Sequence, residues 1–156
     1  MDFRQGKHAG KSFEEVLLKD PATAQWLSVN GQTGIAKEFQ KLIERFDQKP
    51  MTVPCGICGN AATKATGYSE GGLILVFSCE TSDDPWIDEA NGRVIRTFND
   101  AMKFIDDTRK GKKTTKREII RELARAKGLP KRLSGDAAID FFRPSTALIG
   151  GRWVTI

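Results

Sequence analysis

The sequence Cys-Gly-Ile-Cys-Gly at residues 55–59 and the sequence Leu-Ile-Leu-Val-Phe-Ser-Cys at residues 73–79 decide the predicted fold of the middle of the chain. The first predicts a tight turn, since glycines adopt backbone conformations that other residues avoid. The second is an apolar run of strand length, and residues 61–68 predict a partner strand before a glycine-rich turn. We therefore expect a β-hairpin that leads from a cysteine turn to a third cysteine. A further strand over residues 93–98 should follow, and then a helix that Asn99 caps and that runs through Asp107.

The three cysteines of the chain, Cys55, Cys58 and Cys79, all lie in this segment. A C-x-x-C turn aims two thiolates at one metal ion and a hairpin returns further ligands to it, as in the zinc ribbons that this segment resembles. A complete ribbon would have a second C-x-x-C, but Ser82 stands where its last cysteine would be. We expect a zinc ion on the three cysteines, with a metal-free degenerate ribbon or a redox-active C-x-x-C as alternatives. The fourth ligand stays open among Asp83, Asp84, His8 and water.

Residues 1–49 predict a small helical module. Ser12 is a good N-cap for a first helix, and Asp20-Pro21 begins a second one, because proline is favoured in the first turn of a helix. Asn30-Gly31 ends that second helix. A third, amphipathic helix follows, with its apolar residues at helical spacing: Ile35, Phe39, Leu42, Ile43 and Phe46. The residues expected in the core of this module are Phe13, Trp26 and Leu27.

The same module carries a pattern of short motifs. They are Gly6-Lys7-His8, Gly10-Lys11-Ser12-Phe13, Glu15-Val16, Asp20-Pro21 and Trp26-Leu27. This pattern resembles the small domain at the C-terminus of exodeoxyribonuclease X and of related uncharacterised phage and bacterial proteins. The resemblance implies an accessory domain in DNA processing, without chemistry of its own. From the residues alone, Lys7 and Lys11 flank a glycine-rich turn whose backbone amides could meet a phosphate, or the turn is purely structural.

Charge is distributed unevenly along the chain. Residues 51–108 carry 4 Lys/Arg and 9 Asp/Glu, a net charge of −5, whereas residues 109–156 carry 13 and 4, a net charge of +9. Thr115 and Glu118 match a helix capping box, and the helix they begin has one apolar and several basic sides. A basic segment of this kind favours a polyanionic partner. The cations predicted to contact nucleic acid are Lys7, Lys11, Lys112, Lys113, Lys116, Arg117, Arg121, Arg125, Lys131 and Arg132.

The sequence argues against most catalytic classes. One histidine and no G-x-S-x-G motif exclude a serine-hydrolase triad, and Gly6 is one position out of register for a P-loop. No H-x-E or C-x-E pair precedes the cysteine turn, as zinc deaminases require. The acidic run at residues 83–89 leaves a metal-dependent nuclease as a distant alternative. No apolar run predicts a signal peptide or a membrane span, and the cysteine pattern favours a reducing cytoplasm.

We therefore predict an α+β protein with three modules. These are a helical module at residues 1–49, a zinc-ribbon-like hairpin module at residues 50–108, and a basic helical module at residues 109–156 that ends in a hairpin. The predicted function is that of a non-catalytic accessory subunit that binds DNA or RNA in a phage, mobile-element or bacterial processing complex, alongside a protein partner. The alternative is a protein–protein adaptor or inhibitor that acts through the acidic middle segment.

Overall fold

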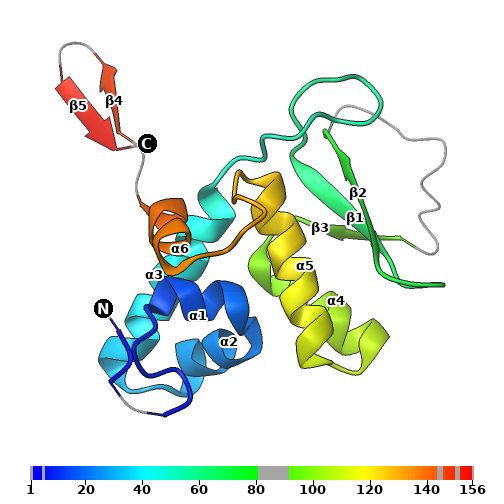
Figure 1. Ribbon diagram of the computed structural model, residues 1–156. Coiled ribbons are helices and arrows are strands. Elements are labelled where there is room, and N and C mark those ends of the chain that lie inside the picture. Colours follow the sequence, from blue (N-terminus) through cyan, green and yellow to red (C-terminus); the bar gives the residue numbers. More distant parts are fainter. Residues whose placement is uncertain (1, 5, 81–91, 144–145, 150–151, 156) are drawn as a thin grey trace.

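The structure is a computed structural model that describes the chain except residues 1, 5, 81–91, 144–145, 150–151 and 156. Within the described residues, six helices accompany two small antiparallel sheets, which confirms the expected α+β class (Figure 1). The helices are α1 (Phe13–Lys19), α2 (Pro21–Asn30), α3 (Thr33–Gln48), α4 (Phe98–Arg109), α5 (Lys113–Ala126) and α6 (Gly135–Phe142). The strands are β1 (Lys64–Tyr68), β2 (Ile74–Ser78), β3 (Arg93–Ile95), β4 (Thr146–Ile149) and β5 (Arg152–Thr155). None of the described helices has the length and apolar character needed to cross a lipid bilayer.

The helices α1 and α2 begin at the caps that the sequence predicts. The side chain of Ser12 accepts a hydrogen bond from the backbone N–H of Glu15 and so caps α1. Asp20 caps α2 in the same way, through the backbone N–H of Thr23. Helix α3 then turns its apolar stripe toward the core. The buried residues of that stripe are Ala36, Phe39, Leu42, Ile43 and Phe46.

Trp26 lies on α2 but is not a core residue, contrary to our expectation. Its side chain is 60% exposed, whereas Ala24 is fully buried. Helix α2 buries the side that carries Ala24 and Ser28, which are one turn apart, and Trp26 lies on a different side. Phe13 is buried and Leu27 is half-buried against the core, as expected.

The β1–β2 hairpin confirms the predicted pairing in the middle segment. Lys64 lies opposite Ser78, so β2 ends one residue before Cys79. The first strand begins later than residue 61, because the backbone N–H of Ala62 bonds instead to the carbonyl of Val53, just before the cysteine turn. Strand β3 pairs with the other edge of β1, which gives the order β2-β1-β3. The sheet therefore holds the cysteine turn beside the end of β2.

Helix α4 packs on this sheet through a close approach at Gly67. A Cβ atom at Gly67 would lie 3.0 Å from side-chain atoms of Phe104, so a larger residue would push α4 away from β1. The capping box of α4 is formed by Thr97 and Asp100, whose side chains each accept from the other's backbone N–H. The expected cap at Asn99 is therefore wrong by two residues.

The N-cap of helix α5 is Lys112, three residues before the predicted N-cap Thr115. Lys112 makes no side-chain cap hydrogen bond, so the predicted capping box of Thr115 and Glu118 is not formed. The reason lies in the connection from α4, where Lys110 and Gly111 have φ angles of 55° and 68°. These two left-handed residues reverse the chain at once, and the helix resumes directly after them. The first backbone N–H groups of α5 therefore have no side-chain cap.

The chain ends in the expected hairpin. Strands β4 and β5 pair in antiparallel fashion, with Ala147 opposite Val154. Residues 150–151, between the two strands, lie outside the described residues. Figure 1 shows this hairpin beyond α6, standing away from the other helices.

A single hydrophobic core includes residues from all three predicted modules. The ring of Phe46, at the end of α3, meets the ring of Phe98 edge to face, with 5.8 Å between centroids, and lies 6.2 Å from that of Phe141 on α6. The carboxylate of Asp47 accepts a 2.7 Å hydrogen bond from the backbone N–H of Phe98. The end of α3 is thus the place where the three modules meet.

Candidate functional site

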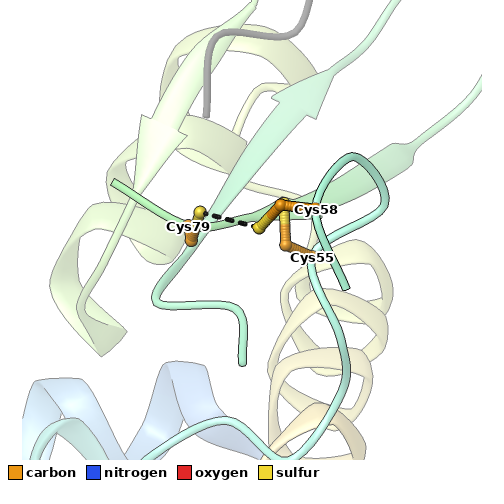
Figure 2. Close-up of side chains that lie close together, drawn as sticks. All are labelled: Cys55, Cys58 and Cys79. Atoms are coloured by element: carbon orange, nitrogen blue, oxygen red, sulfur yellow. Dashed lines mark hydrogen bonds between the residues drawn. The ribbon is translucent and has the colours of Figure 1, made fainter. Parts of the chain in front are cut away.

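The cysteine turn and the end of β2 bring the three cysteines together, as Figure 2 shows. Their sulfur atoms all lie within 4.8 Å of one another, and those of Cys58 and Cys79 are 3.4 Å apart. Cys55 and Cys79 are buried, whereas Cys58 is exposed. Three thiol groups at these separations are close enough to bind one metal ion.

Backbone hydrogen bonds hold the cysteine turn in this shape. The N–H of Gly59 donates to the carbonyl of Cys55, and the N–H of Gly56 donates to the carbonyl of Phe77 on β2, which ties the turn to the hairpin. The N–H of Ile57 donates to the sulfur of Cys55 at 3.4 Å. This hydrogen bond fixes the position of the Cys55 sulfur relative to the backbone of the turn.

The structure removes one candidate for the fourth metal ligand. His8 is not near the cysteines: its Nε2 lies 3.0 Å from a carboxylate oxygen of Asp20. Within the part of the chain that the structure describes, no other Cys, His, Asp or Glu joins the cysteine cluster. The candidates Asp83 and Asp84 lie outside the described residues.

A second candidate site is a pocket between the N-terminal glycine turn and the start of α5, which we call the basic pocket. Its volume is about 400 Å³. It is lined by Lys7, His8, Lys11, Lys19, Asp20, Lys113, Thr114, Arg117 and Arg121. Six of these nine residues are Lys or Arg and one is Asp, so the lining carries a net charge of +5 with His8 neutral. Two segments far apart in the sequence thus concentrate positive charge in one recess.

The predicted nucleic-acid-binding cations divide between the basic pocket and other surfaces. Those that line the pocket are Lys7, Lys11, Lys113, Arg117 and Arg121. Those that are exposed outside the lining are Lys112, Arg125, Lys131 and Arg132. The pocket therefore joins half of the predicted cations in one place.

Lys116 is not available to a ligand, contrary to our prediction. Its side chain is buried, and its Nζ lies 2.7 Å from a carboxylate oxygen of Asp106 on α4. Lys116 precedes Ile119 and Ile120 by three and four residues, so it lies on the apolar side of α5 that packs against α4. This lysine fixes one helix against another and contributes no free cation.

The backbone amides of the glycine turn are also engaged. The N–H groups of Ala9, Gly10 and Lys11 all donate to backbone carbonyls of residues 3–8. Gly6 and Gly10 have φ angles of 84° and 80°, which only glycine adopts without strain. The two glycines therefore have a structural role in the turn. The turn contributes to the basic pocket through the side chains of Lys7 and Lys11.

Asp20 organises one wall of the basic pocket. One of its carboxylate oxygens lies 3.2 Å from Nζ of Lys7 and 3.0 Å from Nε2 of His8, and accepts a 2.8 Å hydrogen bond from the hydroxyl of Thr23. Burial raises the pKa of this carboxyl, but the hydrogen bonds from Thr23, Lys7 and His8 outweigh it and lower the pKa to about 2. The ionised carboxylate thereby holds Lys7 and His8 at the pocket.

Arg121 carries a positive charge for which the described residues show no acidic partner. Its Nε atom is buried and has no hydrogen-bond partner among the described residues. Burial lowers the pKa of Arg121, and the positive charges of Arg117 and Arg125 lower it further. An anion in the pocket would relieve both effects.

No family model, curated protein or solved structure matches the chain. The resemblances of the N-terminal segment and of the cysteine segment therefore stay predictions, and the two sites are the observations that bear on the function.

Sequence reasoning missed part of the pocket lining, namely His8 as a pocket residue, Lys19, Asp20 and Thr114. The sequence indicates that Asp20 caps α2, but it does not indicate that the same carboxylate also contacts Lys7 and His8 at the pocket. The position of Asp20 next to the turn lysines follows from the packing of α1 and α2 under the glycine turn. Spacing along the sequence carries no signal for that contact.

Proposed function

We propose that this protein is a non-catalytic accessory subunit that binds DNA or RNA, and that the basic pocket contacts the phosphate backbone. The observation that carries the proposal is the meeting of the turn lysines with the basic side of α5 in one recess. Such a surface binds a polyanion because each neutralised phosphate releases condensed counterions. The exposed cations outside the pocket are further candidates for phosphate contacts: Lys112, Arg125, Lys131 and Arg132.

The non-catalytic role is supported by the state of the titratable groups at the pocket. Asp20 and His8 are bonded to each other, and Asp20 is also bonded to Lys7 and Thr23. A carboxylate with a pKa of about 2 is a poor general base at neutral pH. The resemblance to the exodeoxyribonuclease X accessory domain favours a place in a phage, mobile-element or bacterial DNA- or RNA-processing complex.

For the cysteine cluster we propose zinc in a structural role. Zn–S bonds of about 2.3 Å place tetrahedral sulfurs about 3.8 Å apart, and the three sulfurs here lie within 4.8 Å of one another. Thiolate ligands suit zinc, and Cys55, Cys58 and Cys79 would hold the ion. Zinc would supply a cross-link between the cysteine turn and the end of β2.

The adaptor alternative depends on free acidic groups in the middle segment. Four of the five carboxylates that the structure describes in residues 51–108 are engaged within the chain. They are Glu80 with Arg96, Asp100 with the backbone at Thr97, Asp106 with Lys116, and Asp107 with Arg93. The acids at residues 83–89, on which the nuclease alternative also depends, lie outside the described residues. The described part of the segment therefore favours nucleic-acid binding over the adaptor.

The test is a salt titration of binding to labelled DNA and RNA, followed by fluorescence anisotropy. About four phosphate contacts give a slope of log K against log salt near −3 to −4. Replacing Arg117 and Arg121 by glutamine should flatten the slope by about one to two units, similarly for all sequences, because phosphate contacts do not read bases.

The matched control replaces Lys37 and Lys41, two exposed lysines on α3 outside the pocket lining, by glutamine. It changes the net charge equally and should leave the slope within about half a unit of that of the unmodified protein. Absence of measurable binding by the unmodified protein at low salt would refute the proposed function and favour the adaptor.

A further inference from the structure

We propose that the basic pocket is a discrete, saturable site for one phosphate group, in which Arg117 and Arg121 bind the phosphate oxygens at the first turn of α5. The inference rests on the proposed function only for the source of the phosphate, which is either a nucleic-acid backbone or a free phosphate ester. It differs from a diffuse basic surface because it predicts one site, a fixed set of contacts and saturation.

The start of α5 supplies the first part of the argument. Helix α5 has 14 residues, so the aligned peptide dipoles place partial positive charge at its N-terminus. Its N-cap residue Lys112 provides no side-chain acceptor for the first N–H groups, which in most helices are satisfied by a cap. Lys113 and Thr114, the first two residues of the helix, line the pocket. Uncapped N–H groups at a helix start are suited to phosphate oxygens.

The two arginines supply the second, independent part. Arg117 and Arg121 are one helical turn apart on α5, so their guanidinium groups share the pocket side of the helix. The buried Nε of Arg121 has no hydrogen-bond partner among the described residues, and such a donor is costly unless a ligand satisfies it. Guanidinium groups bind phosphate through paired hydrogen bonds, which gives the site its geometry.

The size of the pocket admits a phosphate together with part of the group esterified to it. A volume of about 400 Å³ lies in the range of roughly 300–1,000 Å³ that is typical of small-ligand pockets. Lys7 and Lys11 of the glycine turn also line the pocket. The carboxylate of Asp20 contacts Lys7 and His8. The phosphate would therefore lie between α5 and the glycine turn, with space for the ester group attached to it.

The experiment titrates the whole protein with inorganic phosphate and with pyrophosphate at constant ionic strength, balanced with chloride. Backbone amide signals are followed by NMR. We expect saturable shifts at Lys113 and Thr114 and a matching rise in melting temperature. Arg121→Gln and the more exposed Arg117→Gln should each weaken binding at least tenfold, because hydrogen bonds to charged groups are worth that much. The control with glutamine at Lys37 and Lys41 should bind within about twofold of the unmodified protein.

Two outcomes separate this inference from the proposed function. If phosphate saturates the site but labelled DNA and RNA do not bind, the site stands, the natural ligand is a free phosphate ester and the proposed function is wrong. If the amide signals of Lys113 and Thr114 do not respond to either anion, the inference is overturned, even where nucleic acid binds through other cations. Competition of phosphate with a bound oligonucleotide would support both. The unmodified protein answers these questions by itself, so the result does not depend on the folding of a variant.

Discussion

The sulfur atoms of Cys58 and Cys79 lie 3.4 Å apart, although twenty residues separate them along the chain. The separation is much longer than a disulfide bond of about 2.05 Å. Two thiolates at this distance would repel each other, so the cluster needs either protons or a metal ion between the sulfurs. The exposed position of Cys58 leaves the cluster accessible to a metal ion from solution.

We expect freshly purified, reduced protein to contain about one zinc ion per chain. Cys58→Ser and Cys79→Ser should each reduce zinc content and lower the melting temperature, because structural zinc contributes roughly 10 kcal/mol or more to small domains. Elemental analysis and thermal unfolding measure both effects. The control is protein that is first treated with a chelator and then given zinc again. If freshly purified protein contains no metal, the zinc prediction is wrong and the cysteines are buried thiols of a degenerate ribbon.

The ion pair of Lys116 and Asp106 predicts unequal effects of its two deletions. Lys116 is 11% exposed and Asp106 is 51% exposed at the side chain. Asp106→Ala leaves a buried ammonium without its partner and should cost about 2 kcal/mol of unfolding free energy. Lys116→Met leaves a carboxylate that water still reaches and should cost less than about 1 kcal/mol. Urea unfolding compares the two, and equal losses would contradict the argument.

Lys116→Met should also leave the salt slope of nucleic-acid binding unchanged, whereas Arg117→Gln should flatten it by about one unit. The two residues are neighbours in sequence, so comparison of the two variants distinguishes a cation with a structural role from a cation that binds the ligand. A Lys116 variant that folds and yet binds as weakly as the Arg117 variant would show that the lysine reaches the ligand.

Asp20 predicts a pH dependence of stability. Its pKa in the folded protein is about 2, below its ordinary value of 3.8, so the folded state releases the proton more readily than the unfolded state. The stabilisation is therefore fully present above about pH 4 and is lost as the pH falls toward 2. After allowance for solvent screening it amounts to about 1 kcal/mol. Urea unfolding of Asp20→Asn between about pH 2 and 7 should show a deficit at neutral pH that disappears in acid.

A deficit that persists unchanged at pH 2 would mean that the asparagine disturbs α2 by another route. The exposed Asp136, replaced by asparagine, is a suitable control for the loss of one carboxylate.

Replacement of Lys127 should destabilise the protein without changing its binding to nucleic acid. The buried Nζ of Lys127 donates 2.8 Å hydrogen bonds to the backbone carbonyls of Phe46 and Lys49, at the end of α3. Lys127→Met keeps most of the volume but leaves both carbonyls without this donor, which should cost about 1–3 kcal/mol. Thermal unfolding measures the loss, and the salt slope of nucleic-acid binding should not change. A fully stable variant would show that water replaces the ammonium at the helix end.

Trp26 and Phe39 predict opposite outcomes for the removal of a large aromatic side chain. Trp26→Ala should change the unfolding free energy by less than about 0.5 kcal/mol, because the side chain is 60% exposed. Phe39→Ala should cost about 3–5 kcal/mol, because Phe39 is fully buried. Urea unfolding followed by far-UV circular dichroism compares the two variants without relying on tryptophan fluorescence. A large loss in the Trp26 variant would place that side chain in the core after all.

The parts of the fold that could be predicted from the sequence rest on local chemistry. Ser12 and Asp20 cap helices because their side chains reach the backbone two or three residues on, and that reach depends on nothing distant. The stripe of α3 is visible because apolar residues recur with the helical period. The cysteine cluster could be predicted because a turn and a hairpin bring ligands together by local geometry alone.

The parts that could not be predicted depend on packing between distant segments. Lys116 and Arg117 are adjacent cations in the sequence, and only the position of α4 makes one of them buried and leaves the other at the pocket. The start of α5 was misplaced because the left-handed conformation of Lys110 is not evident from its residue type. The basic pocket itself exists only because α1 and α5 lie side by side.

The junction at Phe46 bears on how such a chain could evolve. Phe46 packs against Phe98 and Phe141, and its carbonyl accepts from Lys127, so each of the other two modules supplies part of its surroundings. A gene fragment for the first 49 residues, fused to an unrelated partner, would carry an aromatic surface with nothing to cover it. The modules are therefore poorly suited to exchange by recombination. A stable chimeric protein that contains Phe46 would also need aromatic residues equivalent to Phe98 and Phe141.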